Sequence, residues 1–149
     1  MAQEYEVVII GGGSAGLTAG LFAARHGHST LIVERLMGGG QIINAEGIDN
    51  YPGFPQGIPG AELGPLMQEH AMDAEVEMEM AETTELRIDN PYKVLVTTGG
   101  EYRTRAIIIA GGSSLRRLGI PGEAELEGRG VSHCATCDGP FFQNQVVGV

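Results

Sequence analysis

The sequence predicts an α/β fold that opens with a strand, a helix and a second strand, followed by an antiparallel β-meander. One observation is the continuous apolar run Val7–Ile10, which ends at three glycines and is typical of a buried parallel strand. A second apolar run, Thr30–Val33, follows an intervening segment rich in small residues. Strand, glycine turn, helix and strand within about 30 residues indicate a βαβ unit.

The segment between the two apolar runs predicts a helix over Ser14–Gly27, because its alanines and glycines recur on one face. Gly27 is a typical C-terminal stop for that helix. Residues 36–60 are rich in glycine and proline without periodicity, so we expect a long loop, which in a compact domain is usually functional or disordered. A second helix is expected over Ala61–Ala74.

Four short segments after the second helix are expected to be strands: 75–80, 82–89, 92–98 and 101–109. Asn90-Pro91 and Gly99-Gly100 are turn signals between them. We interpret these strands as an antiparallel meander inserted after the βαβ unit. Residues 106–110 are again continuously apolar, so that strand is expected to return to the parallel sheet. Residues 146–149 are expected to begin a further strand.

Composition excludes several classes of protein. The 149 residues suit one domain, or one domain and part of another. Acidic residues outnumber lysine and arginine by 19 to 9, which argues against a nucleic-acid partner and against docking on an anionic membrane. The sequence has neither an apolar run long enough for a membrane span nor a secretory signal. We therefore expect a cytoplasmic protein.

The glycine turn carries the strongest binding signal. It reads G-x-G-x-x-G, follows a predicted strand and opens a predicted helix, and Glu34 ends the next strand. In this context the motif indicates a Rossmann-like dinucleotide site. The helix start would attract a pyrophosphate, and Glu34 would accept hydrogen bonds from ribose hydroxyls. The candidate cofactor-binding residues here are Gly11, Gly13, Ser14, Ala15, Gly16 and Glu34.

The only two cysteines of the chain are Cys134 and Cys137. This spacing can close a small disulfide ring and often lowers the pKa of one thiol. A zinc site would need further ligands, and c-type haem would need histidine where Asp138 stands. We interpret the pair as redox-active, with a reduced buried pair and a structural disulfide as the alternatives. His133 and Asp138 flank the pair and either could move protons.

Two further segments are weaker candidates. Gly39, Gly40 and Gln41 lie in the long loop before Asn50, and small polar groups beside glycines suit contact with a flat heterocycle. An ordinary surface loop is the alternative. Ala110 and Gly111 end a buried strand, where a second backbone segment could approach a cofactor or simply leave the sheet.

Taken together, these motifs resemble the low-molecular-weight thioredoxin reductases over essentially the whole chain. The resemblance rests on the glycine fingerprint, Gly-Gly-Gln at 39–41, Asn-Tyr-Pro-Gly at 50–53 and, above all, Cys-Ala-Thr-Cys-Asp-Gly at 134–139. It implies a flavoprotein with two dinucleotide-binding domains. Residues 1–114 would belong to the FAD-binding domain, and residues 115–149 would begin the NADPH-binding domain that carries the cysteines.

The resemblance also implies a function. Electrons would pass from NADPH through FAD to a Cys134–Cys137 disulfide and then to thioredoxin, in a homodimeric enzyme. Cys137 would face the flavin, Cys134 would attack the partner, and Asp138 would act as acid and base. The alternatives are a flavin-dependent dithiol oxidase, a peroxidase-feeding reductase and a non-catalytic FAD-binding fragment.

The sequence departs from this family in two respects. The strand-end motif usually reads Ala-Thr-Gly in the family, whereas here Gly111 replaces the threonine, which removes a hydroxyl near the flavin. Family members are also about twice as long, and we find no second glycine fingerprint for NADPH. We therefore expect the chain to be the N-terminal part of a thioredoxin reductase, with the NADPH site outside it.

Overall fold

The computed structural model describes residues 2–148, apart from the side chains of Thr136 and Cys137. The chain divides into two compact units, residues 1–112 and residues 113–149. Each unit is described by itself. The assignment of residues 1–114 and 115–149 to an FAD and an NADPH domain stays a prediction.

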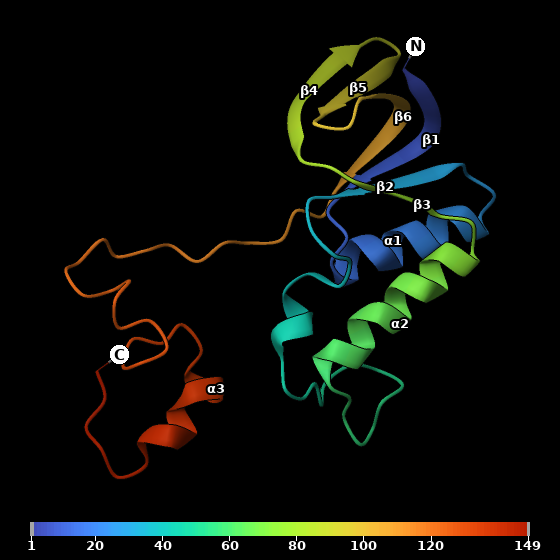
Figure 1. Cartoon of the computed structure of the whole chain (residues 1–149). Helices are drawn as coiled ribbons and strands as arrows, with labels where there is room; N and C mark the ends of the chain where they lie inside the picture. The colour runs from blue at the N-terminus through green and yellow to red at the C-terminus, as the bar shows by residue number, and fades with distance from the viewer. Residues whose placement is uncertain (1, 149) are drawn as a thin grey trace. The chain divides into compact units, whose positions relative to one another are not determined.

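The first unit is built on one six-stranded mixed sheet with strand order β3-β2-β1-β6-β5-β4 (Figure 1). Strands β3, β2, β1 and β6 are parallel to one another, and β6, β5 and β4 are antiparallel. The strands are β1 (Gln3–Ile10), β2 (Thr30–Glu34), β3 (Glu77–Met80), β4 (Thr83–Asp89), β5 (Tyr92–Thr97) and β6 (Glu101–Ile109).

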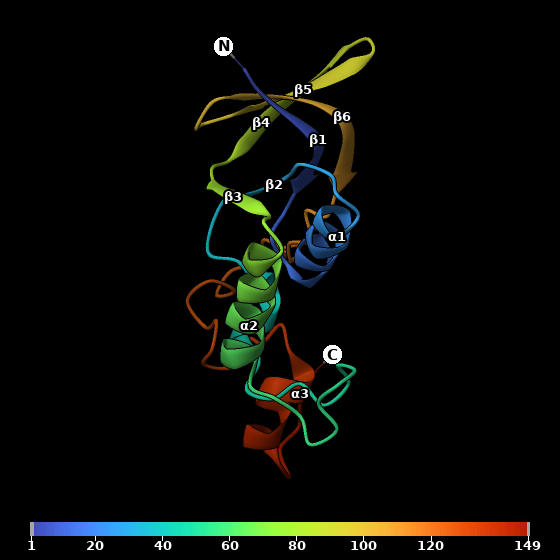
Figure 2. The same cartoon turned by 90° about the vertical axis from the view of Figure 1, so that its right-hand side faces the viewer.

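The predicted βαβ unit is confirmed. Helix α1 (Ser14–Arg25) connects β1 to β2, which pair in parallel, and α2 (Gly60–Asp73) connects β2 to β3. Both helices pack on one face of the parallel strands (Figure 2). The cluster that joins them to the sheet contains Ile9, Leu17, Ile32, Ala71 and Val76, all nearly inaccessible to solvent.

The opposite face of the same strands has its own core. Strand side chains alternate between faces, so Val8 and Leu31 point away from the helices while their neighbours Ile9 and Ile32 point toward them. Leu95 of β5 and Tyr102 of β6 pack with this second set. The parallel strands are therefore covered on both faces, which explains their continuous apolar runs.

The extent of the meander was predicted wrongly at its first strand. Strand β3 pairs in parallel with β2, with Leu31 opposite Glu77, so the antiparallel part begins only at β4. The reason is that α2 carries the chain back along the sheet before β3 begins. The return of the last strand is confirmed, because β6 pairs in parallel with β1 and antiparallel with β5.

The long loop between β2 and α2 has local structure of its own. It contains the short 3₁₀ helix η1 (Gly40–Asn44) and an antiparallel bridge between Ile48 and Ile58. The loop backbone contacts the first residue of α2 closely, since a Cβ at Gly60 would lie 1.7 Å from the carbonyl oxygen of Ile42. This loop therefore lies directly on the first turn of α2.

The second unit is mostly irregular, with a short helix α3 (Ala135–Asp138) and a 3₁₀ helix η2 (Gly139–Phe142). The strand expected from residue 146 is not formed over 146–148, where Val146 is fully exposed. A strand needs a hydrogen-bonded neighbour, and no described residue pairs with these three. Val149 lies outside the described residues. Within residues 2–148, no helix is both long and apolar enough to cross a membrane.

Candidate functional site

Gly11 makes the turn between β1 and α1, and only glycine fits there. Its φ is +102°, a conformation that residues with a side chain rarely adopt. A Cβ at this position would also lie 2.3 Å from the carbonyl oxygen of Ala110. The Gly11 N–H donates to the carbonyl of Val33 at 2.8 Å. The turn is thus fixed between the ends of β2 and β6.

Gly16 lets the first turn of α1 lie against this loop. A Cβ on Gly16 would be 1.8 Å from the carbonyl oxygen of Gly11. The backbone of the helix start therefore contacts the backbone of the turn directly. No side chain could be inserted without moving one of the two segments.

No side chain of the described residues caps the N-terminus of α1, which suits an anion. The N-cap residue is Gly13. The first intrahelical bond is made by Leu17, whose N–H donates to the Gly13 carbonyl at 2.9 Å. The N–H groups of Ser14, Ala15 and Gly16 therefore have no acceptor within the helix, and the helix dipole favours negative charge at this end.

Glu34 stands beside the glycine turn, as expected from its place at the end of β2. Its Oε2 accepts the N–H of Gly12 at 2.6 Å, and its Oε1 accepts the N–H of Leu36 at 2.9 Å. Two backbone donors thus fix the carboxylate. Each oxygen retains a second lone pair that can accept from a hydroxyl. The predicted role toward a ribose stays a prediction.

The structure brings Gly39 and Gly40 to the same turn. The Gly39 N–H donates to the carbonyl of Gly12 at 2.7 Å, and Gly39 forms a parallel bridge with Gly13. A Cβ on Gly40 would lie 2.9 Å from the Cα of Gly13. The loop therefore forms a second backbone wall next to the open end of α1.

Sequence reasoning missed Gly64, which supports that wall from α2. A Cβ on Gly64 would lie 3.3 Å from the Cα of Gly39, and a Cβ on Gly39 would lie 3.0 Å from the Cα of Gly64. The available signal was the pair Gly60 and Gly64, which share one helix face at a spacing of four residues.

The other predicted loop residues are less tightly placed. Gln41 follows the wall within η1 and is exposed. Asn50 is exposed too. The participation of Asn50 in a cofactor site therefore stays a prediction.

Ala110 and Gly111 do reach the turn. The N–H of Ala110 donates to the carbonyl of Ile10 at 2.8 Å, which extends the parallel ladder to the end of β1. Gly111 follows in open space, because a Cβ built on it has no atom of the described residues within 4 Å apart from those of its chain neighbours. The glycine that replaces the family threonine is therefore not required by packing.

In the second unit, Cys134 is disulfide-bonded. Its carbonyl accepts the N–H of Asp138 at 3.0 Å across α3. The Ser132 hydroxyl also contacts both backbone groups of Cys134. Asp138 is half-buried. The side chain of Cys137 lies outside the described residues, so its predicted part in the disulfide stays a prediction.

Charged side chains lie close to the cysteine segment. Glu127 pairs with Arg117 at 3.4 Å through one carboxylate oxygen and approaches His133 Nε2 at 3.9 Å through the other. No group of three or more histidine, cysteine, aspartate or glutamate residues in the described part of the chain could hold a metal ion.

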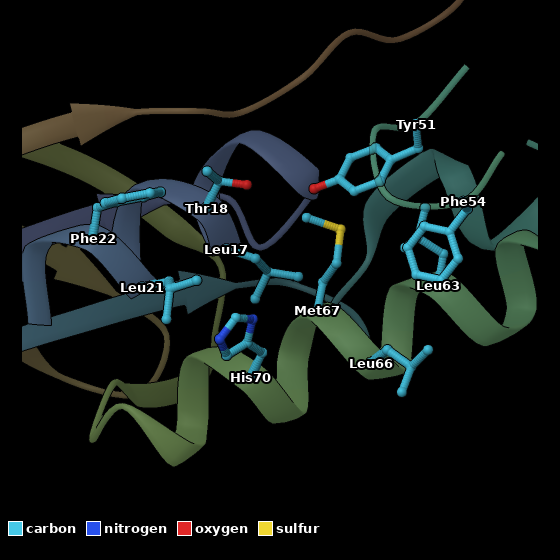
Figure 3. Close-up of a pocket in the computed structure, with 10 residues that line it drawn as sticks. All are labelled: Leu17, Thr18, Leu21, Phe22, Tyr51, Phe54, Leu63, Leu66, Met67 and His70. Carbon is cyan, nitrogen blue, oxygen red and sulfur yellow. The ribbon is translucent and has the colours of Figure 1, made fainter. Parts of the chain in front are cut away.

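A cavity of about 340 Å³ opens between α1, α2 and the loop at 51–54 (Figure 3). Its lining is apolar apart from Thr18, His70 and the Tyr51 hydroxyl. The sequence analysis did not predict this cavity. The residues that line it are Leu17, Thr18, Leu21, Phe22, Tyr51, Phe54, Leu63, Leu66, Met67 and His70.

Comparison with known proteins gives consistent results. The family model described as pyridine nucleotide-disulphide oxidoreductase matches residues 5–147. Thioredoxin reductase of Bacillus subtilis is 46% identical over 147 residues, which cover 97% of this chain and 46% of that protein. The bifunctional thioredoxin reductase/thioredoxin of Mycobacterium leprae is 45% identical over 146 residues, which cover 97% of this chain and 32% of that protein.

The fold is similar to that of solved thioredoxin reductases. The Lactococcus lactis enzyme in its FR conformation superimposes with a TM-score of 0.80 at 46% identity, covering 94% of this chain and 46% of that one. The chain thus spans about half the length of the Bacillus subtilis relative and about a third of the length of the Mycobacterium leprae relative.

Proposed function

The chain belongs to the pyridine nucleotide-disulphide oxidoreductase family, and from this premise we propose that it is the FAD-binding and disulfide-bearing part of a thioredoxin reductase. The complete enzyme would use NADPH to reduce the disulfide of thioredoxin. We further propose that it is a homodimer in the cytoplasm, and that its NADPH site lies outside these 149 residues.

The observation that carries the proposal is the open N-terminus of α1 beside a carboxylate held by two backbone donors. The N–H groups at positions 14–16, which have no acceptor within the helix, suit the two negative charges of a pyrophosphate. Glu34, held by Gly12 and Leu36, suits the hydroxyls of an adenosine ribose. Its charge also disfavours a 2′-phosphate, so the turn fits FAD better than NADPH.

The residues present therefore fit an FAD. Gly11, Gly13 and Gly16 would admit the pyrophosphate, Glu34 would bind the ribose, and Gly39 and Gly40 would line the opposite side. When bound, FAD supplies the two-electron chemistry that connects a nicotinamide to a disulfide.

The chemistry of the second unit is thiol–disulfide exchange. In the reduced protein, the Cys134 thiolate would attack one sulfur of the thioredoxin disulfide, forming a mixed disulfide and releasing one thioredoxin thiolate. Cys137 would then attack Cys134, which closes the protein disulfide and releases the second thioredoxin thiolate. Asp138 would pass protons to and from the departing sulfur. The exchange consumes two protein thiols and yields two thioredoxin thiols.

FAD binding by the chain tests this proposal. Replacing Glu34 with glutamine keeps the shape of the side chain but removes its charge and one acceptor. We expect the dissociation constant for FAD, measured by quenching of flavin fluorescence, to rise at least about tenfold, because a charge-assisted hydrogen bond contributes roughly 1.5–3 kcal/mol.

Arg35→Gln is the matched control, since it changes an exposed charge at the next position. It should leave FAD affinity within about twofold of the wild type, a few tenths of a kcal/mol. Equal affinity in the wild type and both variants would contradict the assignment of FAD to the glycine turn.

A further inference from the structure

The hydroxyl of Ser132 contacts the cysteine segment at two points. Its oxygen accepts the N–H of Cys134 at 3.0 Å and donates its own proton to the carbonyl of Cys134 at 3.2 Å. A serine hydroxyl has one donor and two acceptor positions, so both bonds can form at once. One exposed side chain thus holds the backbone groups on both sides of the Cys134 Cα.

Ser132 is itself anchored on its other side. The N–H of the preceding residue, Val131, donates to the carbonyl of Leu126 at 2.9 Å, and its carbonyl accepts the N–H of Gly128 at 3.0 Å. The hydroxyl therefore connects a hydrogen-bonded loop at 126–131 to the cysteine that follows it.

The same Cys134 carbonyl also accepts the N–H of Asp138. Asp138 ends the helical turn that contains position 137. The two cysteine positions are thus connected through one carbonyl, and Ser132 restricts the rotation of that carbonyl. Groups held in the bound geometry lose less conformational entropy when a ring closes.

We propose that Ser132 is a positioning residue for Cys134, holding its backbone in the conformation that closes the redox disulfide. This inference rests on the proposed function, because it assumes that Cys134 and Cys137 form the disulfide. Loss of the hydroxyl gives the reduced form more conformations than the oxidised form. The disulfide then becomes easier to reduce.

The test is the redox equilibrium of the full chain with glutathione. In this exchange one protein disulfide and two glutathione thiols give two protein thiols and one glutathione disulfide. We compare the wild type with Ser132→Ala, which removes the hydroxyl, and Ser132→Thr, which keeps it. Ser114→Ala is the matched control, because it removes a hydroxyl from another exposed serine of the same unit.

We expect Ser132→Ala to shift the equilibrium toward the dithiol about fivefold, the effect of one ordinary hydrogen bond. That is about 20 mV in potential, since a tenfold change is about 30 mV for two electrons. Ser132→Thr and Ser114→Ala should stay within about twofold of the wild type, or about 10 mV. Amide exchange at Cys134 should accelerate only in Ser132→Ala, which reports loss of the bond directly.

The possible failures are distinguishable. A wild-type chain whose cysteines do not exchange with glutathione contradicts the proposed function, and the inference falls with it. A wild type that exchanges reversibly, with Ser132→Ala at the same potential, overturns the inference alone. A shift of equal size in Ser132→Thr overturns it too, because the hydroxyl would then not be the cause.

Discussion

The contact between the start of α1 and the glycine turn can be tested by replacing Gly16 with alanine. The added Cβ would lie 1.8 Å from the carbonyl oxygen of Gly11, and 3.0 Å is the shortest separation that real Cβ atoms tolerate, so the two segments must separate by about 1.2 Å. Both are backbone, so no side chain can rotate to make room.

The size of the effect follows from two opposing terms. Overpacking of this kind lowers the free energy of unfolding by about 3 kcal/mol at the upper end of its usual range. Replacing glycine with alanine within a helix raises it by about 1 kcal/mol. We therefore expect Gly16→Ala to lower the free energy of unfolding by about 2 kcal/mol. Affinity for FAD should fall at least about tenfold, because the first-turn N–H groups move with the helix.

Gly20→Ala in the same helix is the matched control. Its Cβ would lie 2.8 Å from the Cδ1 of Ile32, which is the flexible end of a side chain. The cost should nearly cancel the helical gain, leaving a change within about 1 kcal/mol. Urea unfolding followed by circular dichroism gives the stabilities, and flavin fluorescence gives the affinities. Equal stability and equal FAD affinity in the two variants would refute this description of the turn.

Two further predictions concern other parts of the chain. The Glu123 carboxylate accepts the N–H groups of Leu118 at 2.9 Å and Gly119 at 2.7 Å, which holds its pKa below the ordinary value. Because the folded pKa is depressed, this stabilisation is present at neutral pH and is lost as the pH falls from 4.5 through the folded value. Amide protection at Gly119 should fall over that range in the wild type and should lose this pH dependence in Glu123→Gln, whose side chain does not titrate. A pH-independent protection in the wild type would contradict the contact. Gly111→Thr should leave the urea midpoint nearly unchanged, since the position is open, and should raise FAD affinity by restoring a hydroxyl there. A fall of more than about 1 kcal/mol in the free energy of unfolding would show steric conflict.

Most of the first unit could be predicted from the sequence because its signals are local. The apolar run at 7–10, the glycines after it and the apolar run at 30–33 predicted the βαβ unit and the position of Glu34. The direction of β3 could not be obtained in this way. Alternation at 75–80 predicts a strand, but its parallel pairing with β2 depends on how α2 packs across the sheet.

Contacts between distant backbone segments were harder to predict. Gly64 supports the loop at Gly39 through a close approach. The four-residue spacing of Gly60 and Gly64 places both on one helix face but does not indicate which segment that face contacts. Ser132 precedes the cysteine motif and carries no signal by residue type, since serine is common in loops. The two hydrogen bonds to Cys134 are the observation that indicates a positioning role.

The most direct test of the central claim is the visible absorption spectrum of the purified chain after saturation with FAD, removal of free FAD and anaerobic addition of dithiothreitol. The account predicts a bound flavin band in the wild type that bleaches as electrons enter through the Cys134 disulfide. Cys134→Ser should bind the same amount of FAD and bleach much more slowly. A wild-type chain that retains no flavin, or equal bleaching in the two proteins, would contradict the account.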